Sequence, residues 1–225
     1  MTDPTFVRHN QARLAVHCLR AGEGPRLLTL HALGLSTSER VLDLVGRWPG
    51  PVHGLDFTGH GASTVPTGGG YSAEILSADV DAALAELGPC TLYGQGLGGY
   101  VALLVAGCRP SLVRGAIIDD GPGLAGGSPV PGPPSILSPP TTIVPGRTPD
   151  PWALLELSRD VRPPDYAVTM LRLAAMVSGS TEPVAVVARQ RPPWLIAVVD
   201  DPATLVDDLD AVLARYAASE GSSNP

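Results

Sequence analysis

The segment Leu92–Leu104, LYGQGLGGYVALL, places a glycine-rich turn between an apolar run and a stretch of small, apolar residues. This pattern predicts a buried strand, a tight turn and a helix that packs closely on a sheet. Two kinds of site use such a turn. In one, a nucleophilic side chain stands at its centre, and in the other a dinucleotide pyrophosphate lies across it. The central residue here is Gly96, which has no side chain. The turn alone therefore does not distinguish the two kinds of site, and the rest of the sequence is needed.

Apolar runs alternate with helix-like segments through the N-terminal half. Short apolar runs predict strands that are buried on both faces of a parallel sheet. The predicted strands cover 6–18 (one or two strands), 26–33, 51–57, 90–94 and 113–119. The predicted helices cover 36–47, opened by a capping box of Ser36 and Glu39, about 72–87, capped by Ser72, and 97–109. This order predicts an α/β fold, a mostly parallel sheet flanked by helices.

The sequence changes character after residue 119. Residues 120–151 are rich in proline and glycine and predict an irregular cap or loop, because proline removes hydrogen-bond donors and glycine adds chain entropy. Helical spacing returns at 152–160 and 164–178. We expect a single domain over residues 1–225 that includes this excursion.

The C-terminal segment predicts one further strand and one further helix. The apolar run 194–200 indicates the strand, and Asp201 and Pro202 have the residue types expected at the start of the helix. The chain then ends, so we expect a reduced C-terminal part that lacks a last strand and helix. Such a loss exposes a sheet edge, which a second chain or the C-terminal helix would cover. A homo-oligomer is therefore one expectation.

Composition excludes several classes of function. The net charge is −7 and no basic run occurs, which argues against nucleic-acid binding. No stretch has the length of a membrane span, and the N-terminus lacks a signal-peptide core, so we expect a cytoplasmic protein. Cys18, Cys90 and Cys108 lie in apolar runs as reduced thiols, and no cluster has metal-ligand spacing. We predict no metal and no cofactor. The abundance of glycine, alanine and proline indicates a GC-rich bacterial source.

The dinucleotide hypothesis has a complete local match. Gly94, Gly96 and Gly99 have the spacing G-x-G-x-x-G between a predicted strand and a predicted helix, and Asp119 ends the next strand, where an acidic residue would bind ribose hydroxyls. However, in such domains the motif sits on the first strand of the unit. Here several strands precede it, and the excursion follows Asp119 directly. We keep this hypothesis as a second alternative.

Three blocks of the N-terminal half point elsewhere, and they occur in one order. They are LLTLHALG (27–34), GLDFTGHGAS (54–63) and YGQGLGGYVAL (93–103). Together they resemble the α/β-hydrolase family, in its branch of esterases, lipases and dehalogenase-like enzymes. The resemblance implies that the third block is a nucleophile elbow over Gly94, Gln95, Gly96 and Leu97. It also implies that the backbone amides of Leu33 and Leu97 form an oxyanion hole, and that residues 120–151 take the place of a lid.

The chain departs from the family pattern at two catalytic positions. Gly96 stands where the family has its serine, and it relieves the strain of a positive φ angle, about 1–3 kcal/mol for other residues. The family histidine follows the last strand, whereas the histidines here are His9, His17, His31, His53 and His60. Asp200 or Asp201 lies where the family's acid often lies, although Asp201 is equally a helix cap. A Ser-His-Asp triad is therefore not available.

Two hypotheses of function follow from this resemblance. The first is a catalytically degenerate member, a pseudoenzyme that binds a small-molecule ligand or a protein partner. The alternative is a hydrolase or lyase that uses the residual oxyanion hole with a base outside the triad. His31 and His60 are the candidate bases, and Asp119 and Asp200 are weak candidate acids. Structural roles, in loop ties and strand ends, explain these four residues as well.

Overall fold

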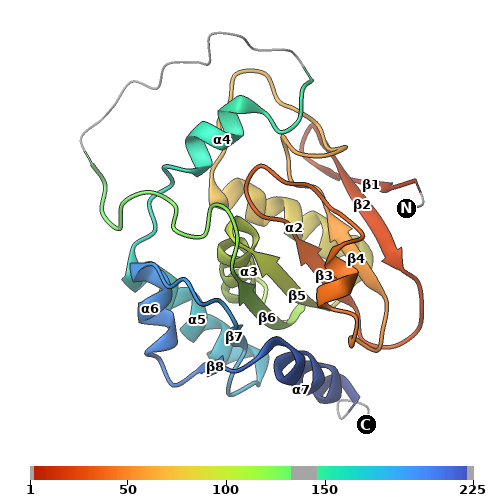
Figure 1. Ribbon diagram of the computed structural model, residues 1–225, viewed down its shortest axis with the longest axis vertical. Coiled ribbons are helices and arrows are strands. Elements are labelled where there is room, and N and C mark those ends of the chain that lie inside the picture. The colour runs from red at the N-terminus through yellow and green to blue at the C-terminus, as the bar shows by residue number, and fades with distance from the viewer. Residues whose placement is uncertain (1–2, 133–145, 222–225) are drawn as a thin grey trace.

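The computed structural model describes residues 3–132 and 146–221 as one eight-stranded sheet with helices on both faces (Figure 1). The strand order is β1-β2-β4-β3-β5-β6-β7-β8, in which β2 is antiparallel to its neighbours and the pairs from β4 to β8 are parallel. The strands are β1 Thr5–His9, β2 Ala12–Arg20, β3 Leu27–Leu30, β4 Val52–Leu55, β5 Cys90–Gln95, β6 Val113–Asp119, β7 Val184–Val186 and β8 Thr204–Val206. The predicted fold class is confirmed.

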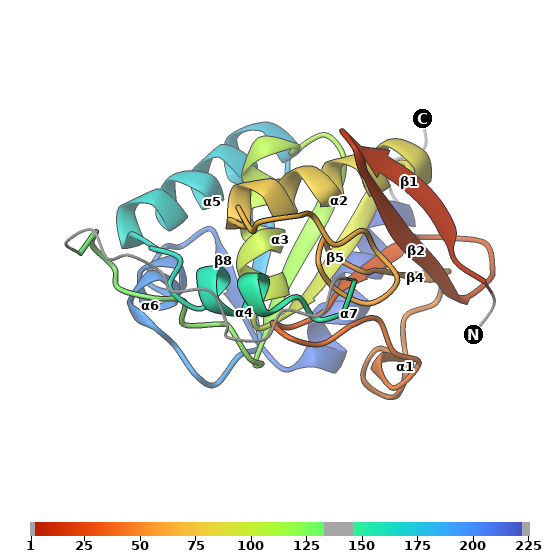
Figure 2. The ribbon, with the colours of Figure 1, turned by 90° about the horizontal axis from the view of Figure 1, so that it is seen from above.

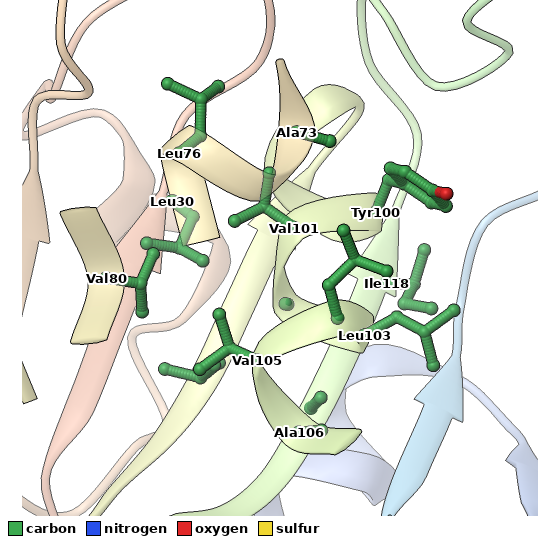
Figure 3. Close-up of a cluster of buried hydrophobic side chains, with 14 of the residues drawn as sticks. Leu30, Ala73, Leu76, Val80, Tyr100, Val101, Leu103, Val105, Ala106 and Ile118 are labelled. Carbon is green, nitrogen blue, oxygen red and sulfur yellow. The ribbon is translucent and has the colours of Figure 1, made fainter. Parts of the chain in front are cut away.

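The helices divide between the two faces of the sheet. They are α1 Val41–Leu44, α2 Ala73–Leu87, α3 Leu97–Cys108, α4 Pro151–Leu157, α5 Pro164–Ser178, α6 Pro193–Val199 and α7 Leu209–Gly221. Helices α2, α3, α5 and α6 contribute to the larger apolar core, and α1 and α7 contribute to a smaller one on the opposite face (Figure 2). Figure 3 shows part of the larger core, where Leu76, Val101 and Leu30 come from α2, α3 and β3.

Helix α3 packs unusually close to the sheet because its first turn is glycine-rich. A Cβ on Gly98 would lie 2.3 Å from the Leu30 carbonyl oxygen, and a Cβ on Gly94 would lie 2.2 Å from the Gly98 carbonyl oxygen. A Cβ on Gly99 would lie 2.8 Å from the side chain of Ile118. Contact between helix and sheet therefore explains these glycines, including two of the three in the dinucleotide pattern.

The C-terminal secondary structure differs from the sequence-based prediction. Residues 194–200 do not form a strand, because Pro193–Val199 is helix α6 and buries Trp194, Leu195 and Val198 on one face. A short apolar run fits a strand or a buried helix equally well. Here the buried residues have the spacing of one face of a helix. Strand β7 was not predicted.

The last helix also begins later than predicted. Asp201 caps no helix, since its Oδ1 accepts a hydrogen bond from the Ala203 amide and its Oδ2 pairs with Arg172. Residues Thr204–Val206 form strand β8 instead, and α7 starts at Leu209. The C-terminal strands are short, but the strand and helix that we expected to be missing are present. We expected a second chain or the C-terminal helix to cover a sheet edge exposed by the loss of these elements. Because the elements are present, that expectation loses its basis.

Two other predictions concern loops. The capping box at Ser36 and Glu39 does not form: α1 begins at Val41, and Arg40 is its N-cap without a side-chain hydrogen bond. Ser72 does cap α2, by accepting a hydrogen bond from the Ile75 amide. Of the predicted excursion, residues 133–145 lie outside the described residues. Among the described residues, each helix is too short or too polar to cross a lipid bilayer.

Candidate functional site

The turn between β5 and α3 has the conformation of a nucleophile elbow. Gly96 has φ 56° and ψ −117°, a backbone conformation that side-chain-bearing residues rarely adopt. Its amide donates to the Asp119 carbonyl oxygen at 3.0 Å, which ties the turn to the end of β6. The positive φ angle that the sequence implies for this position is therefore present, with a residue that adopts it without strain.

The amides of Leu33 and Leu97 converge on a single oxygen. Leu33 follows β3 and Leu97 opens α3, and both amides donate to the carbonyl oxygen of Pro122, at 3.0 and 3.1 Å. Two amides directed at one oxygen are the arrangement of an oxyanion hole. Here the oxygen belongs to the chain itself, in the segment that follows β6.

The same segment fills the space above Gly96. A Cβ on Gly96 would lie 2.2 Å from the Pro122 carbonyl oxygen and 2.6 Å from the carbonyl carbon of Gly121. These contacts are with backbone atoms, which cannot swing aside as the end of a flexible side chain can. The volume in which a nucleophilic side chain would project is therefore occupied. We call Gly121–Leu124 the plug.

Buried side chains hold the plug in place. The Nη1 atom of Arg162 donates to the carbonyl oxygens of Gly123 and Leu124, each at 2.6 Å, and the Trp194 Nε1 atom donates to the Leu124 oxygen at 2.9 Å. Arg162 is 1% exposed, and its guanidinium lies 4.4 Å from the centre of the Tyr100 ring. Burial lowers the pKa of Arg162 to about 10, so the side chain remains charged at neutral pH.

His31 is neutral, and both ring nitrogens have backbone partners. The Phe57 amide donates to Nε2 at 3.1 Å, so the ring proton lies on Nδ1, which donates to the Ala32 carbonyl oxygen at 2.9 Å. Burial, and then the neighbouring His60, lower the pKa of His31 to about 4. A base must have a free lone pair near the reacting group, and that of His31 already accepts a hydrogen bond.

His60 has a similar environment, with its ring centre 5.0 Å from that of His31. Its Nδ1 atom lies 3.2 Å from the Thr58 carbonyl oxygen, and its Nε2 atom accepts from the Gly34 amide at 3.4 Å. Burial lowers the pKa of His60. The two rings therefore tie together the loops that follow β3 and β4.

The candidate acids are also engaged in local hydrogen bonds or lie exposed. Asp119 accepts from the Tyr93 hydroxyl at 2.5 Å and from the Asp120 amide at 2.7 Å. Burial, followed by the charge of Asp119, raises the pKa of Tyr93. Asp120 accepts from the amides of the segment after β7, at 2.9 and 3.0 Å. Asp200 is exposed at the C-terminal end of α6.

The position after the last strand is occupied by a helix cap. Strand β8 ends at Val206, and Asp207 and Asp208 follow it. The Asp208 Oδ1 atom accepts from the Ala211 amide at 2.9 Å, as an N-cap does. The resemblance implies a histidine after the last strand, and this chain has a capping aspartate there. Asp208 was not predicted from the sequence, although its position before LDAVLARY is a recognisable capping signal.

A cavity of about 530 Å³ opens beside the elbow. Its walls are the segment after β3, the C-terminal ends of β3 and β5, and Thr148 and Pro149 before α4. Gln95 lines this cavity, whereas Leu33, Gly96 and Leu97 are not among its described lining residues. The structure thus places Leu33, Gly96 and Leu97 at the plug and Gln95 at the cavity. Two arginines were not predicted as site residues from the sequence: Arg162, which holds the plug, and Arg40, which lines the cavity.

Comparison with solved structures gives the same fold at low sequence identity. A hypothetical protein from Pseudomonas aeruginosa PAO1 is 16% identical, with a TM-score of 0.62 over 96% of this chain and 97% of the other. A bacterial membrane phospholipase A is 15% identical, with a TM-score of 0.55 over 98% of this chain and 87% of the other. At these identities the likeness concerns the fold alone.

Other similar structures match only part of the chain. An E-2-(acetamidomethylene)succinate hydrolase is 27% identical over 51% of this chain and 42% of its own length, with a TM-score of 0.45. This chain thus spans less than half of that protein. No curated protein matches the sequence.

The family itself is shown by the sequence. A profile of the alpha/beta hydrolase family matches residues 27–223, which include all three blocks and the whole C-terminal part. The chain therefore belongs to the alpha/beta hydrolase family.

Proposed function

We propose that this protein is a catalytically degenerate member of its family, one that binds a small ligand or a protein partner and does not hydrolyse esters. The observation that carries the proposal is the Pro122 carbonyl oxygen, which accepts hydrogen bonds from both Leu33 and Leu97. A substrate carbonyl would have to displace this oxygen. Each displaced hydrogen bond contributes about 1 kcal/mol, and the Arg162 contacts oppose movement of the plug as well.

The missing side chains support the same proposal. Gly96 supplies no nucleophile, and a side chain there would meet the plug. Asp208, which caps α7, stands after the last strand, where the family histidine is expected. Because loss of one triad member lowers the rate by several orders of magnitude, loss of two at a filled site leaves little hydrolytic capacity.

The two alternatives have less support. A hydrolase or lyase with a base outside the triad would use His31 or His60, yet the ring nitrogens of both have backbone partners. Dinucleotide binding would use the amides at the start of α3. The Gly96 and Leu97 amides already donate to Asp119 and Pro122.

The proposal is tested by hydrolysis of p-nitrophenyl acetate. The parent protein and Gly96→Ser should both give the rate of the buffer alone, because the serine would have neither a base nor room for its side chain. Gly132→Ser is the matched control, since a Cβ on exposed Gly132 has nothing within 4 Å. A parent rate clearly above background that falls in His31→Gln or His60→Gln would overturn the proposal in favour of the enzyme alternative.

A further inference from the structure

The cavity lies where the sheet topology leaves a crevice. The segment after β3 leads to α1 on one face of the sheet, and β5 leads into α3 on the opposite face (Figure 2). Strands β3 and β5 are adjacent and parallel. Where the connections from adjacent parallel strands go to opposite faces, a crevice remains beyond their carboxyl ends, and ligands bind there in open α/β sheets. The plug fills the α3 side of this edge, and the cavity occupies the α1 side.

Hydrogen bonds hold the cavity walls on two sides. On one side, the Thr37 amide donates to the Asp56 Oδ1 atom at 2.7 Å. On the other side, Asp150 follows the lining residue Pro149; its carboxylate accepts from the Tyr71 hydroxyl at 2.6 Å, and its amide donates to the Gly59 carbonyl oxygen at 2.8 Å. Asp150 is 3% exposed. The site is therefore formed before a ligand arrives, which reduces the entropy lost on binding.

The lining combines apolar and polar side chains and includes one cation. Leu30, Val41 and Leu44 line the cavity together with Leu35, and Leu35 and Leu44 are among the more exposed large apolar side chains. Among the described lining residues, Arg40 alone carries a charge, because His31 is neutral. The acidic residues next to Arg40 in the chain, Glu39 and Asp43, are not among those lining residues.

We propose that this cavity binds a small amphipathic carboxylate. Its carboxylate group pairs with the Arg40 guanidinium, and its apolar chain lies against Leu30, Val41 and Leu44. Planar guanidinium and carboxylate groups match in geometry, and the volume of about 530 Å³ is in the usual range for small-molecule sites. The net charge of −7 repels anions at long range, so binding depends on the local contact with Arg40. This inference rests on the proposed function, because it names the ligand of a non-hydrolytic protein.

The test is calorimetric titration with octanoate, and with 1-octanol as a neutral probe of the same chain length. The parent protein should bind octanoate more tightly than 1-octanol. Arg40→Gln should weaken octanoate binding about five- to tenfold, as expected for a charge-assisted hydrogen bond to an exposed side chain, and leave 1-octanol binding unchanged. Arg8→Gln, which removes an exposed arginine from β1, is the matched control and should change neither.

A second variant and a second readout locate the binding. Ser36→Trp places a bulky ring on an exposed lining residue and should abolish binding of both probes. In the parent protein, octanoate should shift the backbone amide resonances of residues 34–41 and 95. Equal octanoate binding by the parent and by Arg40→Gln would overturn the proposal, as would no saturable binding at millimolar octanoate. Neither result affects the ester assay, which tests the lack of hydrolysis separately.

Discussion

The elbow and the cavity lie next to each other at the carboxyl edge of one sheet, yet they are built differently. At the elbow, backbone atoms of the plug satisfy the amides of Leu33 and Leu97. At the cavity, hydrogen bonds of Thr37 and Asp150 hold two of the walls, and about 530 Å³ remains open. In the function proposed above, this difference separates the two halves of the site: the plug fills the half that would perform chemistry, and the cavity beside it is left for a ligand.

The largest effect is expected from Gly96→Ser, which tests the closed half. The new side chain needs a positive φ angle, and its Cβ would lie 2.2 Å from the Pro122 carbonyl oxygen. Strain and overpacking together should lower the free energy of unfolding by about 3–5 kcal/mol, measured by urea denaturation. The Gly132→Ser control should change it by less than about 0.5 kcal/mol. Equal stability of the two variants would mean that the elbow is not filled.

A smaller loss is expected from Arg162→Met, which removes the side chain that holds the plug. Two buried carbonyl oxygens, those of Gly123 and Leu124, lose their charged donor. Methionine carries no charge, so the variant no longer has the cost of burying a cation, and this offsets part of the loss. The free energy of unfolding should therefore fall by about 2 kcal/mol. Arg114→Met, at an exposed position of β6, should leave it within about 0.5 kcal/mol. If both variants behaved alike in urea denaturation, Arg162 would not hold the plug.

The third effect is a pH dependence of stability that comes from His31, whose ring links the loops after β3 and β4. Folding lowers the pKa of His31 from 6.5 to about 4, so between these values the unfolded chain binds more protons than the folded protein. The stability contribution of neutral His31 is complete above pH 6.5 and is lost as pH falls toward 4. The slope of unfolding free energy against pH should therefore be positive there and smaller in His31→Gln. An imidazole NMR titration with a midpoint near 6.5 would contradict this.

The smallest effect on stability is expected from Arg40→Gln, in the open half. Arg40 is exposed and caps α1 without a side-chain hydrogen bond, so the free energy of unfolding should change by less than about 0.5 kcal/mol. Together with Arg162→Met, this variant separates a buried structural arginine from a surface arginine available to a ligand. A destabilisation as large as that of Arg162→Met, measured in the same urea series, would remove the distinction.

Local patterns in the sequence predict most of the fold up to residue 119. Strands β3, β4 and β5 and helices α2 and α3 lie close to their predicted ranges, because apolar runs, a serine cap and glycine turns act locally. The apolar run 194–200 is the clearest failure, since its composition fits a strand and only its burial in the tertiary structure makes it α6.

The candidate site could be predicted only in part. The elbow, its positive φ angle and the two amides are implied by the family resemblance of the blocks that contain Leu33 and Gly96. The occupant of the oxyanion hole does not, because Pro122 lies in a stretch of turn-forming residues whose path depends on tertiary contacts. Arg162 has no local signal either, since arginine is usually exposed and nothing in its neighbourhood in the sequence indicates burial.

Residue-resolved hydrogen exchange of the parent protein shows whether the plug occupies the oxyanion hole. If the amides of Leu33 and Leu97 donate to Pro122, both should exchange as slowly as the amide of Tyr93, inside strand β5. That result would support a closed, non-hydrolytic elbow beside an open cavity. Exchange of both amides at the rate of a solvent-exposed chain, with Tyr93 still protected, would show that the oxyanion hole is open and that the plug does not close the elbow.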